Sequence, residues 1–225
     1  MLPTGLTEEE KKYWAKAEVI LKGLIQELDN KGFIRTKKDI ILDKASFAQM
    51  LFISGRINEH LLLTNMLTTV FTAKAQESEK FFLGLNIGFT KANVSTFWMY
   101  ELFFLFLEST DLFTKNLTLI VIPNTPFWSK MTFGQLTDVL GKECPNFGPK
   151  LVSETDVRLR NSIAHNLYWM ERKDNGSIEL YYTDELGTAM TAKPLQEVLV
   201  SIRKQNLLGV CLTSILDEEI AVLIK

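Results

Sequence analysis

Cysteine and histidine are scarce in this sequence. The 225-residue chain has two cysteines, Cys144 and Cys211, and two histidines. The cysteines are far apart and form no C-x-x-C pair, so they give no disulfide framework and no zinc quartet. No phosphate-binding glycine loop or serine elbow occurs either, and we expect no metal and no other cofactor. This composition fits a reducing compartment, and we expect a cytoplasmic protein.

Long apolar runs are also lacking. The chain leads from Met1 straight into the charged run that starts at Glu8, without the apolar core of a signal peptide. Its most apolar stretch, residues 94–107, is interrupted by Glu101. That stretch is shorter than the roughly 18 to 20 apolar residues that a membrane span needs. We therefore expect no membrane association.

The chain has no excess of positive charge. Its formal net charge is −2 and its pI is about 5.8. Proteins that hold nucleic acid by releasing counterions over a broad surface are usually basic. If this chain binds RNA, we expect it to do so at a local site.

Apolar residues are plentiful and recur at helical spacing. They make up 46% of the chain, which is enough for the core of a single domain over residues 1–225. Thr7 and Glu10 form a capping-box pattern at the start of a helix that ends near Gly32. The periodicity predicts further helices at about 43–75 and 94–113, and a short one at about 132–141 between prolines.

The last third of the chain changes pattern twice. Ser153 and Asp156 predict a helix start, followed by a helix that runs toward His165. Two strand-like runs then flank Asn175-Gly176, which predicts a hairpin insertion at about 167–192, with a further short strand near 188–191. A final helix is expected from Pro194 to the end. The prediction is an all-α, up-and-down helical bundle with a small β-hairpin appendage after the helix that precedes His165.

The segment 160–165, Arg-Asn-Ser-Ile-Ala-His, carries the chemistry. An arginine, a polar residue directly after it and a histidine a few positions later can act on a phosphodiester. Imidazole titrates near neutral pH and can accept or donate a proton, and a guanidinium can stabilise the charge on the phosphate. His165 is the candidate general acid or base, Arg160 the candidate phosphate ligand, and Asn161 would orient them.

This motif, with several helices before it and a strand pair and closing helix after it, resembles the HEPN superfamily. The resemblance implies a metal-independent endoribonuclease with RNA as substrate, in a toxin or antiviral defence system. It also implies a homodimer in which two motifs face each other across one cleft. Some members of the superfamily keep the fold without cleaving RNA, and the alternative is a non-catalytic module that binds a protein or a nucleotide.

Three further residues belong to the candidate site. Arg158 precedes His165 by seven positions and is an alternative to Arg160, but apolar Leu159 follows it, so we assign Arg158 an auxiliary phosphate contact. Ser162 is expected to contact RNA or phosphate as well. A related subgroup carries H-x-Y, whose tyrosine a nucleotidyltransferase-like antitoxin modifies; here Tyr168 stands one position late, which favours base stacking over that modification.

Overall fold

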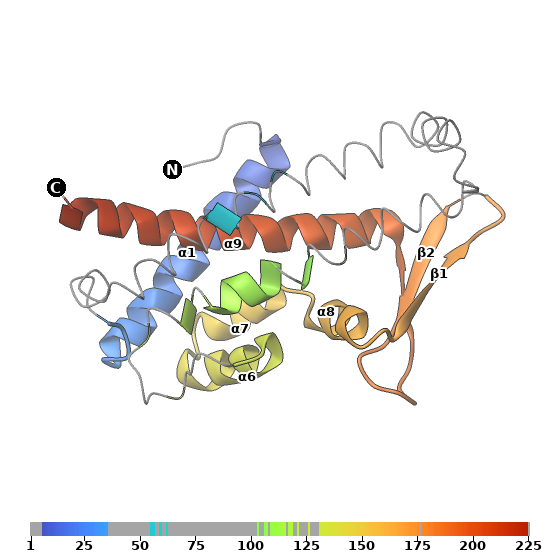
Figure 1. Ribbon diagram of the computed structural model, residues 1–225, viewed down its shortest axis with the longest axis horizontal. Coiled ribbons are helices and arrows are strands. Elements are labelled where there is room, and N and C mark those ends of the chain that lie inside the picture. Colours follow the sequence, from blue (N-terminus) through green and yellow to red (C-terminus); the bar gives the residue numbers. More distant parts are fainter. Residues whose placement is uncertain are drawn as a thin grey trace.

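The computed structural model describes residues 6–35, 131–175 and 177–224, and eighteen scattered positions between them, at 55, 56, 59, 62, 103, 106, 107, 109–115, 117, 118, 121 and 126. The expected helix at 43–75 and the first half of the expected helix at 94–113 lie mostly outside the described residues. His60, the other histidine of the chain, also lies outside them. The elements are α1 (Glu8–Asn30), α6 (Phe133–Glu143), α7 (Gly148–Ser153), α8 (Val157–Ala164), β1 (Tyr168–Arg172), β2 (Ile178–Tyr182), β3 (Thr191–Pro194) and α9 (Leu195–Ile224) (Figure 1).

The predicted capping box at the start of α1 is confirmed. The Thr7 hydroxyl accepts a hydrogen bond from the Glu10 backbone N–H at 3.3 Å, and the Glu10 carboxylate accepts one from the Thr7 N–H at 2.8 Å. These bonds satisfy two of the N–H groups that a helix start leaves without partners. At the other end, Gly32 has φ +68°, a conformation that glycine adopts at little cost.

Glu10 also joins α1 to α9. Its carboxylate accepts a hydrogen bond from Nε of Arg203, and the two side chains are 18% and 15% exposed. Burial opposes ionisation of Glu10, but the hydrogen bonds from Arg203 and from the Thr7 N–H outweigh it and lower the pKa of this carboxyl.

Glu10→Gln is therefore expected to lower the free energy of unfolding at pH 7 by roughly 1 to 2 kcal/mol. A carboxyl whose pKa is lower in the folded state stabilises the protein above its ordinary pKa, and this contribution is lost as the pH falls through the lowered value. The difference between wild type and Glu10→Gln should then shrink below pH 4.5. Urea unfolding at pH 7 and at pH 3 would measure it, and a difference that does not change with pH would contradict the assignment.

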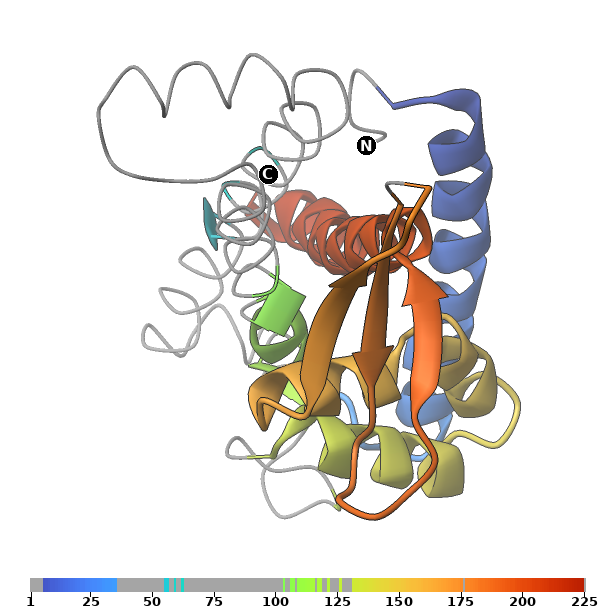
Figure 2. The same ribbon diagram turned by 90° about the vertical axis from the view of Figure 1, so that its right-hand side faces the viewer.

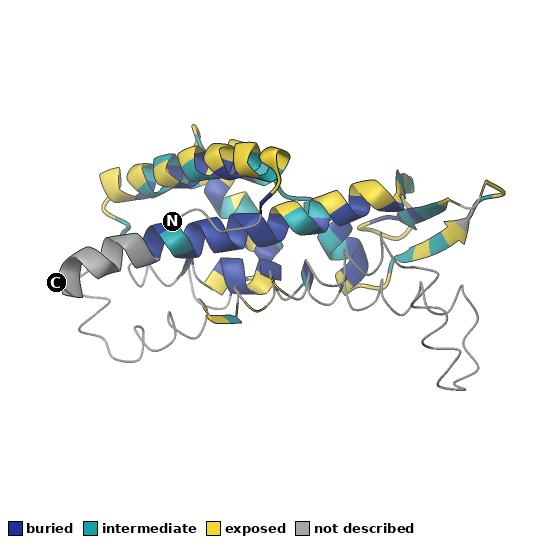
Figure 3. Ribbon diagram, turned by 90° about the horizontal axis from the view of Figure 1, so that it is seen from above, coloured by how far each residue is buried: buried dark blue, intermediate teal, exposed yellow. Residues whose placement is uncertain are grey.

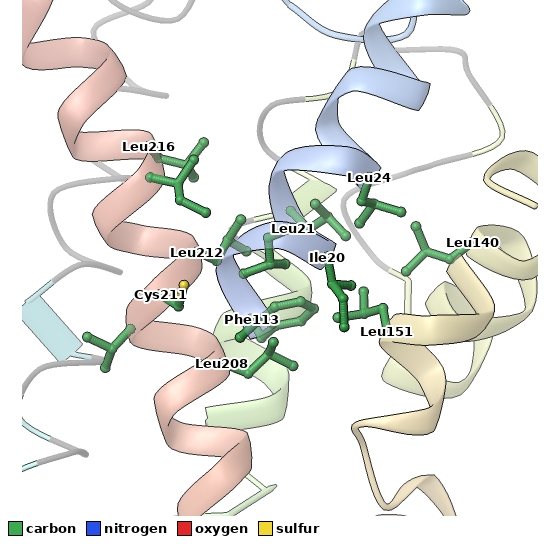
Figure 4. Close-up of a cluster of buried hydrophobic side chains, with 14 of the residues drawn as sticks. Ile20, Leu21, Leu24, Phe113, Leu140, Leu151, Leu208, Cys211, Leu212 and Leu216 are labelled. Carbon is green, nitrogen blue, oxygen red and sulfur yellow. The ribbon is translucent and has the colours of Figure 1, made fainter. Parts of the chain in front are cut away.

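The long helix α9 is the centre of the fold. α1 crosses it, and α6 and α7 lie on the same side of α9 as the lower end of α1 (Figure 1). The middle section of α9 is mostly buried, whereas much of α1 is exposed along its outer side (Figure 3). The first hydrophobic cluster fills the space between these helices. Figure 4 shows members of this cluster from separate parts of the chain, among them Leu21, Phe113, Leu151, Leu208 and Leu212.

α6 and α7 form a tight pair beside α1. The predicted short helix is confirmed as α6, with a capping box between Thr132 and Gln135, but α7 was not predicted. The two helices approach so closely at Gly148 that a Cβ atom there would lie 2.2 Å from the backbone oxygen of Leu140. The ring of Phe147 similarly occupies the space beside Gly23 of α1, where a Cβ would meet it at 2.3 Å.

The three strands form one antiparallel sheet in the order β1-β2-β3. The predicted hairpin is confirmed, with Arg172 opposite Ile178 next to the turn. The further strand is also present, but at 191–194 instead of 188–191, so Pro194 ends a strand and Leu195 begins α9. Leu180 and Tyr182 of β2 are buried in a second hydrophobic cluster, where α8 and α9 contribute Leu159, Ile163, Val198, Leu199 and Ile202.

The expectation of an all-α bundle is therefore wrong, because the fold is mixed. The hairpin is no appendage: β2 and β3 both contact α9, and one face of the sheet covers part of the core. The strand-like runs on either side of Asn175-Gly176 predicted the hairpin, but not that one of its faces would pack against the helices. The single-domain assignment to residues 1–225 stays a prediction. In the described part of the chain, no helix has the length and apolar character required to cross a membrane.

Candidate functional site at the end of α8

Helix α8 carries the motif and is fixed at both ends. At its start, the Asp156 side chain accepts a hydrogen bond from the Leu159 N–H at 3.0 Å. The expected helix start at Ser153 is three residues early, because Ser153 is the last residue of α7. The other carboxylate oxygen of Asp156 accepts a hydrogen bond from the Lys193 ammonium of β3. Burial disfavours the charged ammonium, but its hydrogen bonds to Asp156 and Tyr182 outweigh this and raise the pKa of Lys193. The ion pair between Lys193 and Asp156 thus joins the sheet to the start of α8.

The helix ends at His165 in a turn that reverses the chain. Asn166 has φ +56°, in the left-handed region that asparagine tolerates better than most residues. Its N–H donates to the Ile163 carbonyl at 3.3 Å, and the Leu167 N–H donates to the Ser162 carbonyl at 2.9 Å. This pair of bonds is the Schellman pattern of helix C-termini. The chain then enters β1 directly.

Ser162 takes part in this turn. Its side chain is fully buried, and its hydroxyl donates a hydrogen bond to the Leu167 carbonyl at 2.8 Å. A buried hydroxyl with its proton engaged in this way serves to hold the helix end. The geometry therefore lends no support to the expected contact between Ser162 and RNA.

His165 is exposed at the C-terminal end of α8. Its backbone N–H donates to the Asn161 carbonyl at 3.0 Å, which fixes the position of its Cα atom. Within the described residues, no hydrogen bond or ion pair holds the imidazole ring. The ring is therefore reachable from solvent and free to change its rotamer.

Arg160 is held much more firmly. Its side chain is 15% exposed, and its guanidinium pairs with the Asp111 carboxylate at 3.2 Å and donates to the Asn161 side-chain oxygen at 3.4 Å. The guanidinium Nε is buried without a hydrogen-bond partner in the structure. Residues five apart on a helix point about 140° from each other. Arg160 and His165 thus leave α8 on different sides, with Asn161 between them.

Arg158 is engaged elsewhere. Its Nε pairs with Asp184 at 3.2 Å, and a terminal nitrogen donates to the Ala189 carbonyl. Both partners belong to the connection between β2 and β3, so Arg158 holds this connection against α8. Its charge is paired inside the chain, as that of Arg160 is, so the preference for Arg160 still rests on the polar Asn161 that follows it in the sequence.

Tyr168 packs inward at the start of β1. Its ring meets Phe103 edge to face, with ring centroids 5.1 Å apart, and it lies against the second hydrophobic cluster. The ring is half buried, so it offers a base only part of its surface. The neighbouring Trp169 points to the opposite face of the sheet, is 52% exposed and stacks on Tyr181 at 5.4 Å.

Sequence reasoning missed two residues here. Asp111, the partner of Arg160, lies 49 positions earlier in the chain, and no local pattern links the two. Trp169 could have been found, because side chains alternate between the two faces of a strand, and Tyr168 and Met170 are the residues that pack inward.

No group of three or more histidine, cysteine, aspartate or glutamate side chains that could hold a metal ion occurs among the residues that the structure describes. Comparisons of the chain with family models, with curated proteins and with solved structures find no match. The resemblance to the HEPN superfamily therefore rests on the motif and on the order of elements around it.

Proposed function

We propose that this chain is an endoribonuclease of HEPN type, which cleaves RNA without a metal ion at the end of α8. The observation that carries the proposal is the placement of His165: its imidazole is exposed, and it follows by one helical turn the Asn161 side chain that contacts the Arg160 guanidinium. An imidazole acting on RNA must be reachable by a ribose, and this one is.

The reaction needs one proton removed and one proton supplied. The ribose 2′-oxygen attacks the adjacent phosphorus atom and loses its proton to a base, while the bond to the 5′-oxygen breaks and that oxygen takes up a proton from an acid. The products are a 2′,3′-cyclic phosphate and a 5′-hydroxyl. His165 can serve in either role, and Arg160 can stabilise the charge on the non-bridging oxygens.

One chain alone does not bring all groups together. Arg160 and His165 point to different sides of α8, and only one of the two proton-transfer roles can be filled by one imidazole. A second copy that sets its own α8 against the first would supply the other imidazole. We therefore propose a homodimer with a composite site, in the cytoplasm, where a cognate antitoxin would restrain it.

The test is cleavage of a labelled single-stranded RNA by the purified chain in the presence of EDTA. We expect chelator-resistant cleavage that leaves a cyclic phosphate, and no cleavage of an RNA whose ribose at the cut position lacks the 2′-hydroxyl. Cleavage that stops with EDTA, or that persists on the 2′-deoxy substrate, would contradict the mechanism.

A second candidate function is a non-catalytic module with the same fold. The observation that favours it is that both arginines are already paired inside the chain, Arg160 with Asp111 and Arg158 with Asp184. Such pairing is what a structural role for both guanidinium groups would produce. RNA that stays intact under all conditions, together with binding of a protein or nucleotide that His165→Ala abolishes, would favour this function.

A further inference from the structure

The outer face of the sheet carries a group of side chains that the proposed function does not use. In Figure 2 the three strands lie in front of α9 and α8, and none of the described elements covers their outer face. Trp169, Tyr181 and Ala192 are register partners across the strands and lie on this face, opposite the buried Leu180. We call the group formed by Trp169, Glu171, Lys173, Glu179 and Tyr181 the outer-face cluster.

The aromatic pair in the cluster is held in one arrangement. The rings of Trp169 and Tyr181 are nearly parallel, at 7°, with centroids 5.4 Å apart. The Tyr181 hydroxyl donates to Glu179 at 2.8 Å and accepts from the Lys173 ammonium, which also lies 4.9 Å from the centre of the Tyr181 ring. Because Tyr181 covers one side of the indole and Trp169 is still 52% exposed, the other side of the indole is open to solvent.

The charges around this surface are mainly negative. Glu171 and Glu179 both pair with Lys173, at 3.0 and 3.3 Å, so two carboxylates share one ammonium. The hydrogen bond from Lys173 lowers the pKa of Glu171, which is therefore ionised at neutral pH. Glu171 is 52% exposed, and Asp174 and Glu185 are exposed near the two ends of β2. A phosphate backbone would meet like charges here, which disfavours RNA.

We propose that the outer-face cluster binds an arginine side chain of a partner protein, with the guanidinium stacked on the open side of Trp169 and paired with the Glu171 carboxylate. A planar guanidinium stacks on an indole and donates hydrogen bonds from its edge to a carboxylate, which an ammonium matches less well. Exposed Leu186 and Met190, in the connection from β2 to β3, add apolar surface for the residues that flank the arginine. Tryptophan, tyrosine and methionine are enriched in protein interfaces. This inference does not depend on RNA cleavage.

The probe is a phage-displayed library of random twelve-residue peptides, selected on the immobilised full-length chain. The enriched peptides are expected to share an arginine with apolar neighbours. Resynthesised with a fluorescent label, they should bind at least tenfold more weakly to Trp169→Ala and severalfold more weakly to Glu171→Gln, which keeps the aromatic pair. Val19→Ala, which removes an apolar side chain that is 65% exposed on α1, is the matched control and should bind as wild type does.

Other ligands of this face, such as RNA or a second copy of the chain, would give different results in these experiments. Peptides without arginine, or peptides that bind Trp169→Ala unchanged, would overturn the proposal. A labelled twelve-nucleotide RNA whose binding falls with Trp169→Ala would assign the face to nucleic acid instead. A dimer seen by light scattering that dissociates in Trp169→Ala would assign it to a second copy of this chain. If Trp169→Ala does not fold, the test rests on Glu171→Gln. This variant is expected to have the same melting temperature as wild type, so that weaker peptide binding can be assigned to the lost carboxylate.

Discussion

His165→Ala is expected to reduce RNA cleavage by about a thousandfold, because a positioned general acid or base contributes roughly 10² to 10⁴ in rate. The imidazole is exposed and makes no bond to the described part of the chain, so the melting temperature should not change. Rate constants from single-turnover cleavage of a labelled RNA would measure the effect. His60→Ala, at the other histidine, which lies outside the described residues, is the matched control and should cleave as wild type does.

The same cleavage assay distinguishes the roles of Arg160 and Arg158. Arg160→Ala should cost about a hundredfold in rate, as does the loss of one group that stabilises transition-state charge. Arg158→Ala removes the contacts to Asp184 and Ala189 and should mainly lower the melting temperature, with a smaller effect on the rate. A larger rate loss for Arg158→Ala than for Arg160→Ala would reverse the assignment, and full activity of His165→Ala would end the proposed mechanism.

Gly148→Ala is expected to destabilise the fold by about 3 kcal/mol, which for a chain of this length lowers the melting temperature by roughly 6 to 12 °C. The new Cβ would lie 2.2 Å from the oxygen of Leu140 and 2.7 Å from its carbonyl carbon. Both are backbone atoms, so α6 and α7 must move apart, and the first hydrophobic cluster, which includes Leu140 and Leu151, would loosen. Urea unfolding followed by circular dichroism would measure the change.

Gly141→Ala in α6 is the matched control. A Cβ at Gly141 would meet no atom within 4 Å, and alanine in a helix is favoured over glycine by up to about 1 kcal/mol. Gly141→Ala should therefore be neutral or slightly stabilising. Equal stabilities of Gly148→Ala and Gly141→Ala would show that α6 and α7 are not packed as closely as described.

Local signals predicted several elements well. The capping box at Thr7 and Glu10 and the hairpin at Asn175 both depend on contacts between residues close in sequence, and the structure contains both. Short-range hydrogen bonds of this kind are readable from spacing alone. The end of α8 at His165 was also located correctly, because the first strand-like run of the hairpin begins directly after it.

Predictions that needed long-range contacts did worse. The hairpin was expected outside the core, but Leu180 and Tyr182 bury it against α8 and α9. α7 was missed because its formation beside α1 and α6 depends on close packing at Gly23 and Gly148, which no local pattern reveals.

The sequence by itself determined most of the described helices and strands, α7 excepted, and it placed Arg160, Asn161 and His165 at the end of one helix. These outcomes follow from side-chain spacing and capping within a few residues. Only the tertiary structure decided that the sheet belongs to the core, that Asp111 holds Arg160, and that Arg158 is engaged with the β2–β3 connection. Those contacts join residues that are tens of positions apart. They exist only in the folded chain, and they decide which charges remain available at the surface.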